Sequence, residues 1–180
     1  EDVTPDLFVL GKALTGGYLP LALTVVAEKV FEPFLRRSGP EATLFYGHSY
    51  TGNALGCAAA LASLEIFGRE NVLAALQPKI ALLSEELARL EALRQVKEVR
   101  QCGFICAIEL REGDAREVCI AARKGGLLTR PIRNSIIFMP PFCITEAELR
   151  QAIGALAAAI EEVCNPRTGA NRELETCGAS

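Results

Sequence analysis

The segment PDLFVLGKALTGGYLPLA, residues 5–22, decides how the chain is built. Its apolar run Leu7–Leu10 lies between Pro5 and Gly11, and a run with such ends predicts a short buried strand. Lys12 follows at once, so we expect its side chain at the mouth of a crevice, where the strand leaves the core. Burying an ammonium group is unfavourable unless it is paired or neutralised. A rigidly held, partly desolvated amine is what Schiff-base formation with an aldehyde requires.

Two other interpretations of Lys12 are open from its pattern. Its stem could lie on the core while its ammonium group reaches water, as exposed lysines commonly do. It could also belong to a phosphate-binding loop, which needs a glycine five residues before the Gly-Lys pair and Ser or Thr after it. Those positions hold Asp6 and Ala13, so the phosphate-loop interpretation fails.

The composition is that of a globular protein. Half of the 180 residues are hydrophobic, and the formal net charge is only −3, without a long run of one sign. We therefore expect neither nucleic acid nor a membrane surface as the main partner. No apolar stretch reaches the length of a transmembrane helix.

The cysteines predict a reduced, cytosolic protein. They are odd in number, scattered and mostly within apolar runs, which is typical of core residues rather than of a disulfide framework. No CxxC pair occurs, Glu109 stands where an iron–sulfur triad would continue after Cys106, and there is one histidine. We expect no metal site. The seven cysteines are Cys57, Cys102, Cys106, Cys119, Cys143, Cys164 and Cys177.

Hydrophobic periodicity predicts an α/β chain in two parts, residues 1–82 and 83–164, with a flexible tail at 165–180. The expected strands are 7–10, 19–27, 95–100, 103–110, 127–130 and 136–139. The expected helices are 28–37, 54–67, 69–93 (broken or kinked near Pro78), 114–124 and 145–164. Asn53, Asp114 and Thr145 are expected N-caps. Helix 54–67 is apolar all round, which indicates burial on more than one side, often at a subunit or domain interface.

Two further loops carry polar groups that could bind a ligand. In GHSYTGN, residues 47–53, backbone amides and the Ser49 and Thr51 hydroxyls could hold a phosphate, although a plain capped loop fits as well. In TRPIRN, residues 129–134, Arg130 could bind a carboxylate with two hydrogen bonds, or be a surface arginine. His48 has no carboxylate beside it to orient the ring, which favours a structural role.

Taken together, an imine-forming lysine, a phosphate loop and a carboxylate clamp are the parts needed to hold pyridoxal 5'-phosphate with an amino or keto acid. The segments GKALTGGYLPLA, FYGHSYTGN and RPIRNSIIFMPPF resemble the class III aminotransferases of fold type I. The resemblance extends to about residue 163. It implies the C-terminal part of the large cofactor-binding domain, followed by a small α+β domain.

The resemblance also implies a role for each site residue. Lys12 forms the covalent imine with pyridoxal 5'-phosphate. Ser49 binds the cofactor phosphate of the neighbouring subunit, and Gly47 lines the substrate pocket. Arg130 pairs with the substrate carboxylate. Ile137 matches a position where the family usually has a substrate-contacting tyrosine.

The implied reaction is transamination in biotin synthesis by a cytoplasmic homodimer. 8-amino-7-oxononanoate becomes 7,8-diaminononanoate, with S-adenosylmethionine as amino donor. Lysine as donor, another ω-amino or diamine substrate, and a non-catalytic fragment unable to hold the cofactor remain alternatives. The family's ring-nitrogen aspartate, ring-covering aromatic residue and main phosphate loop would lie before residue 1, so we expect a C-terminal fragment whose isolated form is inactive.

Overall fold

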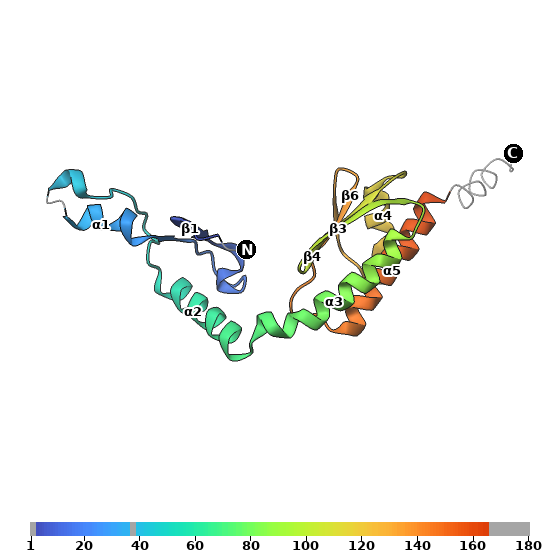
Figure 1. Ribbon diagram of the computed structural model, residues 1–180, viewed down its shortest axis with the longest axis horizontal. Helices are drawn as coiled ribbons and strands as arrows, with labels where there is room; N and C mark the ends of the chain where they lie inside the picture. Colours follow the sequence, from blue (N-terminus) through green and yellow to red (C-terminus); the bar gives the residue numbers. More distant parts are fainter. Residues whose placement is uncertain (1–2, 37–38, 166–180) are drawn as a thin grey trace, which may run out of the picture. The chain divides into compact units, whose positions relative to one another are not determined.

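The computed structural model describes residues 3–36 and 39–165, except for the side chain at position 41, in two compact units (Figure 1). The units are Glu1–Leu73 and Ala74–Ser180. The sequence predicted a boundary after residue 82, whereas the division falls inside the first turn of the helix that begins at Val72. Cys177 and the predicted tail beyond residue 165 lie outside the described residues.

The first unit begins with a two-stranded antiparallel sheet. Strand β1 (Leu7–Leu10) pairs with β2 (Leu23–Val26), so that Leu7 lies opposite Val26. The strand is where the sequence predicted it, but its predicted burial is wrong: Leu7 and Val9 are 56% and 72% exposed, because a sheet of two strands offers little surface to pack against. The short 3-10 helix η1 (Lys12–Thr15) follows β1. The predicted strand 19–27 starts too early, because Leu19 is bonded to the Thr15 side chain and the next residue is a proline, which has no N–H to donate.

Helices complete this unit: α1 (Glu28–Arg36), the 3-10 turn η2 (Pro40–Ala42) and α2 (Ala54–Arg69). Asn53 caps α2 by accepting the Leu55 N–H, at 3.1 Å, as the sequence predicted. The N-terminal turn of α2 packs on the hairpin side, where Gly56 faces the Leu21 side chain.

Helix α2 is much less buried than its sequence predicted. Among the described residues only Gly56 and Ala60 of this helix are buried, while Leu55 and Leu61 are 71% and 68% exposed. Exposing the apolar surface of a helix to water costs a free energy of about 25 cal/mol for each Å². The predicted interface therefore has no counterpart inside this unit.

Helix α3 (Val72–Glu91) begins after a short break at Glu70 and Asn71, and it runs through Pro78 without interruption. The predicted helix 69–93 is thus interrupted at Glu70 and Asn71, and a break at Pro78, the first of the two predicted possibilities, is not found. A proline removes one backbone hydrogen bond from a helix interior, but the buried leucines that flank it, at positions 76, 82 and 83, fix α3 on the core.

The second unit is a four-stranded antiparallel sheet with the order β3-β4-β6-β5. The strands are β3 (Val96–Cys102), β4 (Ile105–Leu110), β5 (Arg130–Ile132) and β6 (Ser135–Phe138). Alternate residues of β4 and β6 form one buried face: Cys106 lies opposite Phe138, and Ile108 opposite Ile136. The residues between them, such as Ile137, lie on the more open face.

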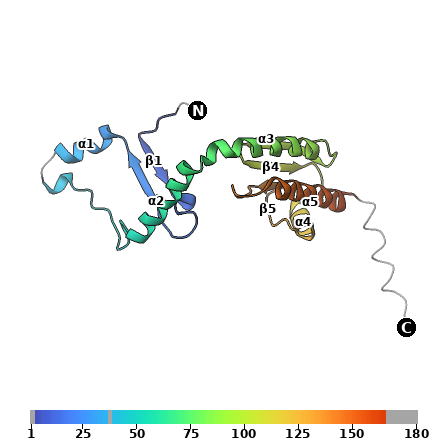
Figure 2. The same ribbon diagram turned by 90° about the horizontal axis from the view of Figure 1, so that it is seen from below.

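Helices α3, α4 (Ala115–Ala122) and α5 (Glu146–Cys164) bury the apolar face of the sheet, with the 3-10 turn η3 (Arg123–Gly125) after α4. In Figure 2, α5 lies between α3 and α4. Asp114 caps α4, and Thr145 caps α5 in a capping box with Glu148, so both predicted caps are confirmed. A Cβ on Gly125 would lie 2.4 Å from the Ala155 Cβ, so this close approach of η3 to α5 needs glycine.

The residue range predicted for one strand of this sheet is wrong. Residues 127–129 are irregular, and β5 occupies Arg130–Ile132, where we expected a turn. The reason is the sheet order, because β5 is an edge strand and Pro131 therefore needs no partner for a missing N–H. Arg133, with a φ of 55°, makes the turn into β6 instead.

Candidate active site

Lys12 is held by the backbone of a tight turn. It is the first residue of η1 and has a φ of 51°, which is uncommon for a residue with a side chain. The N–H of Leu14 donates to the Gly11 carbonyl at 3.1 Å, and the N–H of Gly16 donates to the Ala13 carbonyl at 2.9 Å. The Lys12 side chain therefore leaves a backbone that is fixed on both sides.

Thr15 completes this turn and was missed in the sequence. It is 1% exposed, its hydroxyl donates to the Leu19 carbonyl at 2.5 Å, and the N–H of Leu19 donates back at 3.4 Å. The bond ties the end of η1 to the chain that enters β2. The only sequence signal was a threonine directly before the glycine pair, Gly16 and Gly17, whose φ angles of 63° and 84° allow the reversal.

The expected partial burial of Lys12 is not found. Its side chain is exposed, and none of the described residues forms a hydrogen bond or ion pair with it. The physical reason is local, since the β1–β2 hairpin is only two strands wide and η1 extends beyond it. Lys12 is thus an accessible amine on a fixed backbone, without a crevice wall from this chain.

The loop GHSYTGN is closed by its own hydrogen bonds. The Thr51 hydroxyl accepts the His48 N–H at 2.9 Å, and the His48 Nδ1 accepts the Tyr50 N–H at 3.1 Å. One His48 nitrogen is therefore occupied in the loop, which agrees with the structural role predicted for it. Of the two hydroxyls predicted to face a phosphate, Thr51 is engaged inside the loop.

The Ser49 hydroxyl, in contrast, is exposed and has no hydrogen-bond partner among the described residues. Gly47 opens the same loop, and a Cβ there would touch only the Thr51 hydroxyl, at 3.7 Å. A serine hydroxyl and free backbone amides ahead of a capped helix can bind an anion. Within the described residues, no hydrogen bond joins this loop to Lys12.

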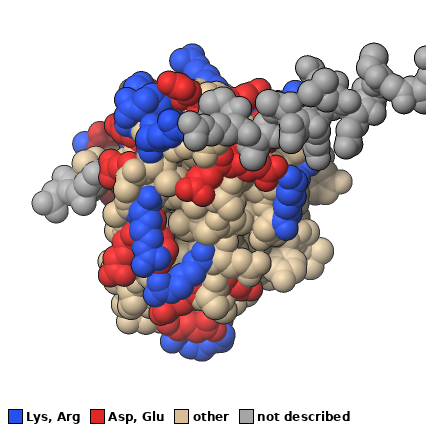
Figure 3. Space-filling view, turned by 90° about the vertical axis from the view of Figure 1, so that its right-hand side faces the viewer, with Lys and Arg blue, Asp and Glu red and all other residues tan. Residues whose placement is uncertain are grey.

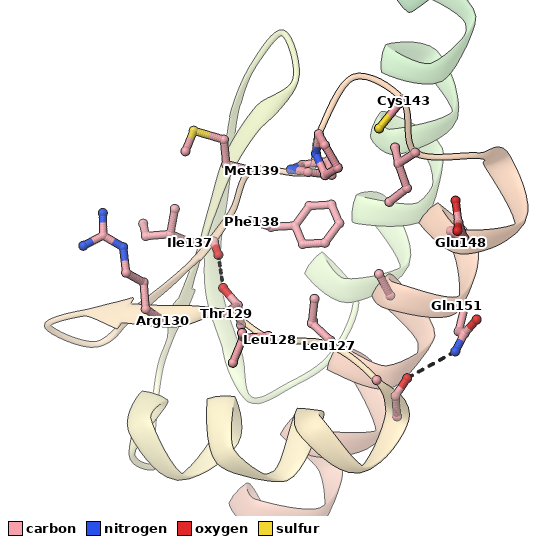
Figure 4. A pocket seen from close by; sticks show the side chains of 16 residues that line it. Leu127, Leu128, Thr129, Arg130, Ile137, Phe138, Met139, Cys143, Glu148 and Gln151 are labelled. Atoms are coloured by element: carbon pink, nitrogen blue, oxygen red, sulfur yellow. Dashed lines mark hydrogen bonds between the residues drawn. The ribbon is translucent and has the colours of Figure 1, made fainter. Parts of the chain in front are cut away.

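Arg130 lies in the second unit, so it is described apart from the other three predicted residues. It begins the edge strand β5 and stands directly opposite Ile137 of β6. Figure 4 shows Arg130, Ile137 and Met139 extending to one side of the strands, and Leu127 and Phe138 to the other. Its guanidinium is exposed and has no ion-pair partner among the described residues.

Arg130 lies at the edge of a hollow of about 940 Å³, which is large enough for a small-molecule ligand. The residues around it are mainly apolar, and Leu127, Met139 and Ile144 are among them. Glu148 also lines the hollow, but its carboxylate accepts the backbone N–H of Thr145 at 2.8 Å. Arg130 is therefore the one charged group of this lining that is left without a partner.

A second set of charges lies on the open face of the sheet. Glu109 binds Lys97 at 2.6 Å and Arg100 at 2.9 Å, and Arg100 also pairs with Glu98. Hydrogen bonds from Lys97 and then Arg100 lower the pKa of Glu109, while Glu109 and then Glu98 raise the pKa of Arg100. Arg100 is therefore neutralised by its neighbours, unlike Arg130.

Two further features of the described residues concern clusters of metal-ligating side chains and membrane-spanning helices. No group of three or more His, Cys, Asp and Glu side chains within 3–36 and 39–165 is placed to hold a metal ion. Over the same residues, no helix combines the length and apolar character needed to span a bilayer. On the face in Figure 3, acidic and basic side chains are interspersed, without one continuous basic field.

Known proteins resemble this chain over most of its length. The family model described as aminotransferase class-III matches residues 1–160. An adenosylmethionine-8-amino-7-oxononanoate aminotransferase of Anoxybacillus flavithermus is 41% identical over 179 residues, which are 93% of this chain and 39% of the relative. The enzyme of that name from Methanocaldococcus jannaschii is 44% identical over 170 residues, 88% of this chain and 37% of the relative.

Solved structures agree with these relatives. The crystal structure of the M. jannaschii enzyme has a TM-score of 0.84 at 43% identity, covering 89% of this chain and 39% of that one. An amine transaminase from an uncultivated Pseudomonas species, in its PLP-bound form, has a TM-score of 0.80 at 32% identity, with 89% and 39% covered. The chain thus spans about two fifths of the length of the proteins it matches.

Proposed function

The chain belongs to the class-III aminotransferase family, and from this premise we propose that the natural protein transfers an amino group to 8-amino-7-oxononanoate. The proposed donor is S-adenosylmethionine, the product is 7,8-diaminononanoate, and the pathway is biotin synthesis. The support is that relatives with 41% and 44% identity carry that name. The predicted α/β fold of type I is confirmed by the match to the solved transaminases.

We propose pyridoxal 5'-phosphate as the cofactor, and the groups present fit it in chemical type. A primary amine on a fixed turn, Lys12, can bond covalently to an aldehyde, and the free Ser49 hydroxyl can donate to a phosphate. When bound, the cofactor would supply an electrophilic carbonyl and an electron sink. The single observation that carries the proposal is the accessible, unpartnered amine of Lys12 on its rigid backbone.

Each residue then has a defined task. The Lys12 Nζ would accept the proton from the donor carbon that bears the amino group, as general base, and in the second half of the reaction it would deliver a proton to the carbon of the acceptor that receives the amino group, as general acid. The Ser49 hydroxyl fixes the phosphate end, which we place in the neighbouring subunit's site. Gly47 keeps that loop free of a side chain next to the substrate. The Arg130 guanidinium holds the acceptor carboxylate at the far end of its chain.

A homodimer is part of the proposal. The support is the apolar surface of α2 that the first unit leaves exposed, including Leu55 and Leu61. Burial of such a helix against other protein would recover the hydrophobic free energy that the unit alone does not gain. We also propose a cytoplasmic location, supported by the six described cysteines, which are all free thiols. The assignment of residues 1–82 to the large domain and 83–164 to the small one stays a proposal.

The test uses the protein as it is naturally encoded, loaded with pyridoxal 5'-phosphate. We expect a visible absorption band of the lysine-bound cofactor, and Lys12→Ala should abolish it. Lys29→Ala is the matched control, because Lys29 is an exposed lysine of the same unit that pairs with Asp6 at 2.6 Å. A band that persists in Lys12→Ala would exclude the proposed role of Lys12.

Turnover assays separate the alternatives for the substrates. The encoded protein is given 8-amino-7-oxononanoate with either S-adenosylmethionine or lysine, and 7,8-diaminononanoate is measured. Product with lysine alone would replace the proposed donor. A normal absorption band without product from either donor would favour another ω-amino or diamine substrate. If the 180 residues alone show no band while the naturally encoded protein does, these residues by themselves do not hold the cofactor.

A further inference from the structure

A second hollow lies between helix α4 and the edge strand β5. Its volume is about 370 Å³, well below that of the hollow described above. Arg116 of α4 and Arg123, the first residue of η3 directly after it, line this hollow together with Arg130 of β5. Its remaining lining is mostly apolar: Cys119, Ile120, Thr129 and Pro131.

The spacing along α4 explains why these residues face one hollow. Arg116, Ile120 and Arg123 are separated by four and three positions, so they share one face of the helix. Seven residues correspond to a rise of about 10 Å along the axis. The two side chains therefore leave the same side of this helical segment about two turns apart, and their long, flexible stems let both guanidinium groups reach one ligand.

These arginines are not neutralised within the described residues. None of the ion pairs in 3–36 and 39–165 includes Arg116, Arg123 or Arg130. The acidic group next to them in sequence, Asp114, does not line the hollow and accepts the backbone N–H of Arg116 at 2.8 Å as the helix cap. Glu117 is one position away from Arg116, off the face that lines the hollow.

We propose that this hollow binds a small phosphorylated ligand, with its phosphate held by Arg116 and Arg123. A phosphate carries close to two negative charges and three acceptor oxygens, so it can satisfy several guanidinium groups at once. A single carboxylate would leave part of this charge unpaired. The hollow is also larger than a phosphate ion, and its floor of Ile120 and Pro131 suits an apolar remainder of the ligand.

Arg130 connects this site to the proposed reaction, because Arg130 and Thr129 line both hollows. A phosphate in the smaller hollow would draw the Arg130 guanidinium towards α4 and away from the acceptor carboxylate. The KM of the acceptor should then rise with phosphate concentration. This consequence rests on the proposed function, whereas the binding of phosphate does not.

The test is isothermal titration calorimetry on the naturally encoded protein with inorganic phosphate, pyrophosphate, phenyl phosphate and acetate as probes. We expect the three phosphate compounds to bind, and phenyl phosphate to bind more tightly than inorganic phosphate because of the apolar floor. The double variant Arg116→Gln/Arg123→Gln should weaken binding by about tenfold or more, since two charged hydrogen-bond donors are lost. Arg133→Gln is the matched control, because it removes an exposed arginine of the β5–β6 turn that does not line the hollow.

The remaining outcomes count against the proposed site or against its link to Arg130. Equal binding of acetate and phosphate would overturn the phosphate class. Equal loss of binding in Arg133→Gln would show unspecific attraction to positive charge. Absence of binding, together with a lower melting temperature of the double variant, would mean that acidic residues of the same protein occupy the hollow. If pyrophosphate binds but the acceptor KM does not change, the link to Arg130 is wrong while the site stands.

Discussion

The Thr15 hydroxyl donates a hydrogen bond to the Leu19 carbonyl oxygen at 2.5 Å, and this bond closes the turn that presents Lys12. Thr15 is buried although the lysine three residues earlier is exposed. The amine is therefore positioned through its backbone, while its own side chain has no hydrogen-bond or ion-pair partner among the described residues. Support from a buried neighbour keeps a reactive group in place without neutralising it.

Thr15→Val should impair activity more than cofactor affinity. The valine keeps the volume but leaves the Leu19 carbonyl without its donor, which costs about 1–3 kcal/mol. We expect kcat of the encoded protein to fall by roughly tenfold, since small misplacements of a reacting group are costly. Steady-state kinetics measure this. Thr15→Ser retains the hydroxyl and should keep most of the activity; equal losses in both variants would contradict the role of the bond.

The second unit depends on a buried carboxylate that the sequence did not reveal. The Glu86 side chain of α3 is only 6% exposed, and it pairs with Arg150 of α5 at 2.5 Å and with Arg89 at 2.9 Å. Arg150→Ala should lower the free energy of unfolding by about 1–2 kcal/mol, because Glu86 would lose its partner while water still screens the half-exposed site.

Arg89→Ala is the control for this pair. Arg89 lies one helical turn from Glu86 and its side chain is 73% exposed, so its loss should have a smaller effect. Urea unfolding followed by circular dichroism measures both variants. If Arg89→Ala were less stable than Arg150→Ala, the ion pair within α3 would matter more than the ion pair between α3 and α5, and the prediction would be wrong.

The sequence predicted well what local rules decide. The N-caps Asn53, Asp114 and Thr145 and the strand Leu7–Leu10 came from short patterns, and the structure has them all. Their physics is contained within a few residues, because a cap needs only its own helix turn and a strand end needs only its Gly or Pro.

The predictions that failed concern features that depend on distant parts of the chain. The position of β5 follows from its place at the sheet edge, and the burial of Glu86 follows from Arg150, 64 residues away. At the candidate site, the position of Lys12 after β1 was predicted. Its exposure agrees with the alternative of a lysine that reaches water and not with the partly buried one, and the fixed turn behind it was not predicted. A positive φ at lysine has no sequence signal, since nothing in the side chain favours it.

Because the Cys106 thiol is buried, we expect the free energy of unfolding to decrease at high pH. Burial raises its pKa from about 9.0 to about 12, and its Sγ lies 3.3 Å from the Phe138 carbonyl oxygen. The folded state therefore keeps this proton where the unfolded state loses it. Stability from this group is complete below pH 9 and is lost progressively as the pH rises towards 12.

Unfolding at pH 8 and pH 10.5 tests this, with Cys106→Ala as the variant that should flatten the pH dependence. Reaction with a thiol reagent gives an independent measure. The exposed Cys102 and Cys143 should react quickly at neutral pH and Cys106 only on unfolding. Rapid labelling of Cys106 in the folded protein would contradict its burial.

Because the capping box of α5 involves an ionised carboxylate, we expect its contribution to the free energy of unfolding to decrease at acid pH. The backbone N–H and the hydroxyl of Thr145 lower the pKa of Glu148, so the folded state favours the ionised carboxylate. Its contribution is present above the ordinary glutamate pKa, near 4.5, and is lost as the pH falls through the lowered value. Thr145→Ala should lower the free energy of unfolding by about 1 kcal/mol at pH 7.

The effect of Thr145→Ala should shrink as the pH falls from 7 through the lowered pKa of Glu148, because below that pKa the carboxylate is protonated in both the variant and the parent protein. Chemical unfolding at pH 7 and at an acid pH below that pKa measures this. Thr145→Ser, which preserves the cap, should behave as the parent protein does. A difference between parent and Thr145→Ala that is equally large at both pH values would show that Glu148 does not contribute to the cap.

Arg130→Ala is the most direct test of the substrate orientation. In the proposed complex the guanidinium pairs with the acceptor carboxylate beside Ile137 and the apolar lining of the larger hollow. Loss of a charged partner is worth about 2–5 kcal/mol, which corresponds to an increase in the acceptor KM of about 30-fold or more. Arg130→Lys retains the charge but not the two parallel hydrogen bonds, so its acceptor KM should lie between that of the parent protein and that of Arg130→Ala. The donor half-reaction, followed by the change in cofactor absorption without acceptor, should be affected far less. An unchanged acceptor KM in Arg130→Ala would remove this residue from the substrate site, because no other unpaired charge lines that hollow within the described residues.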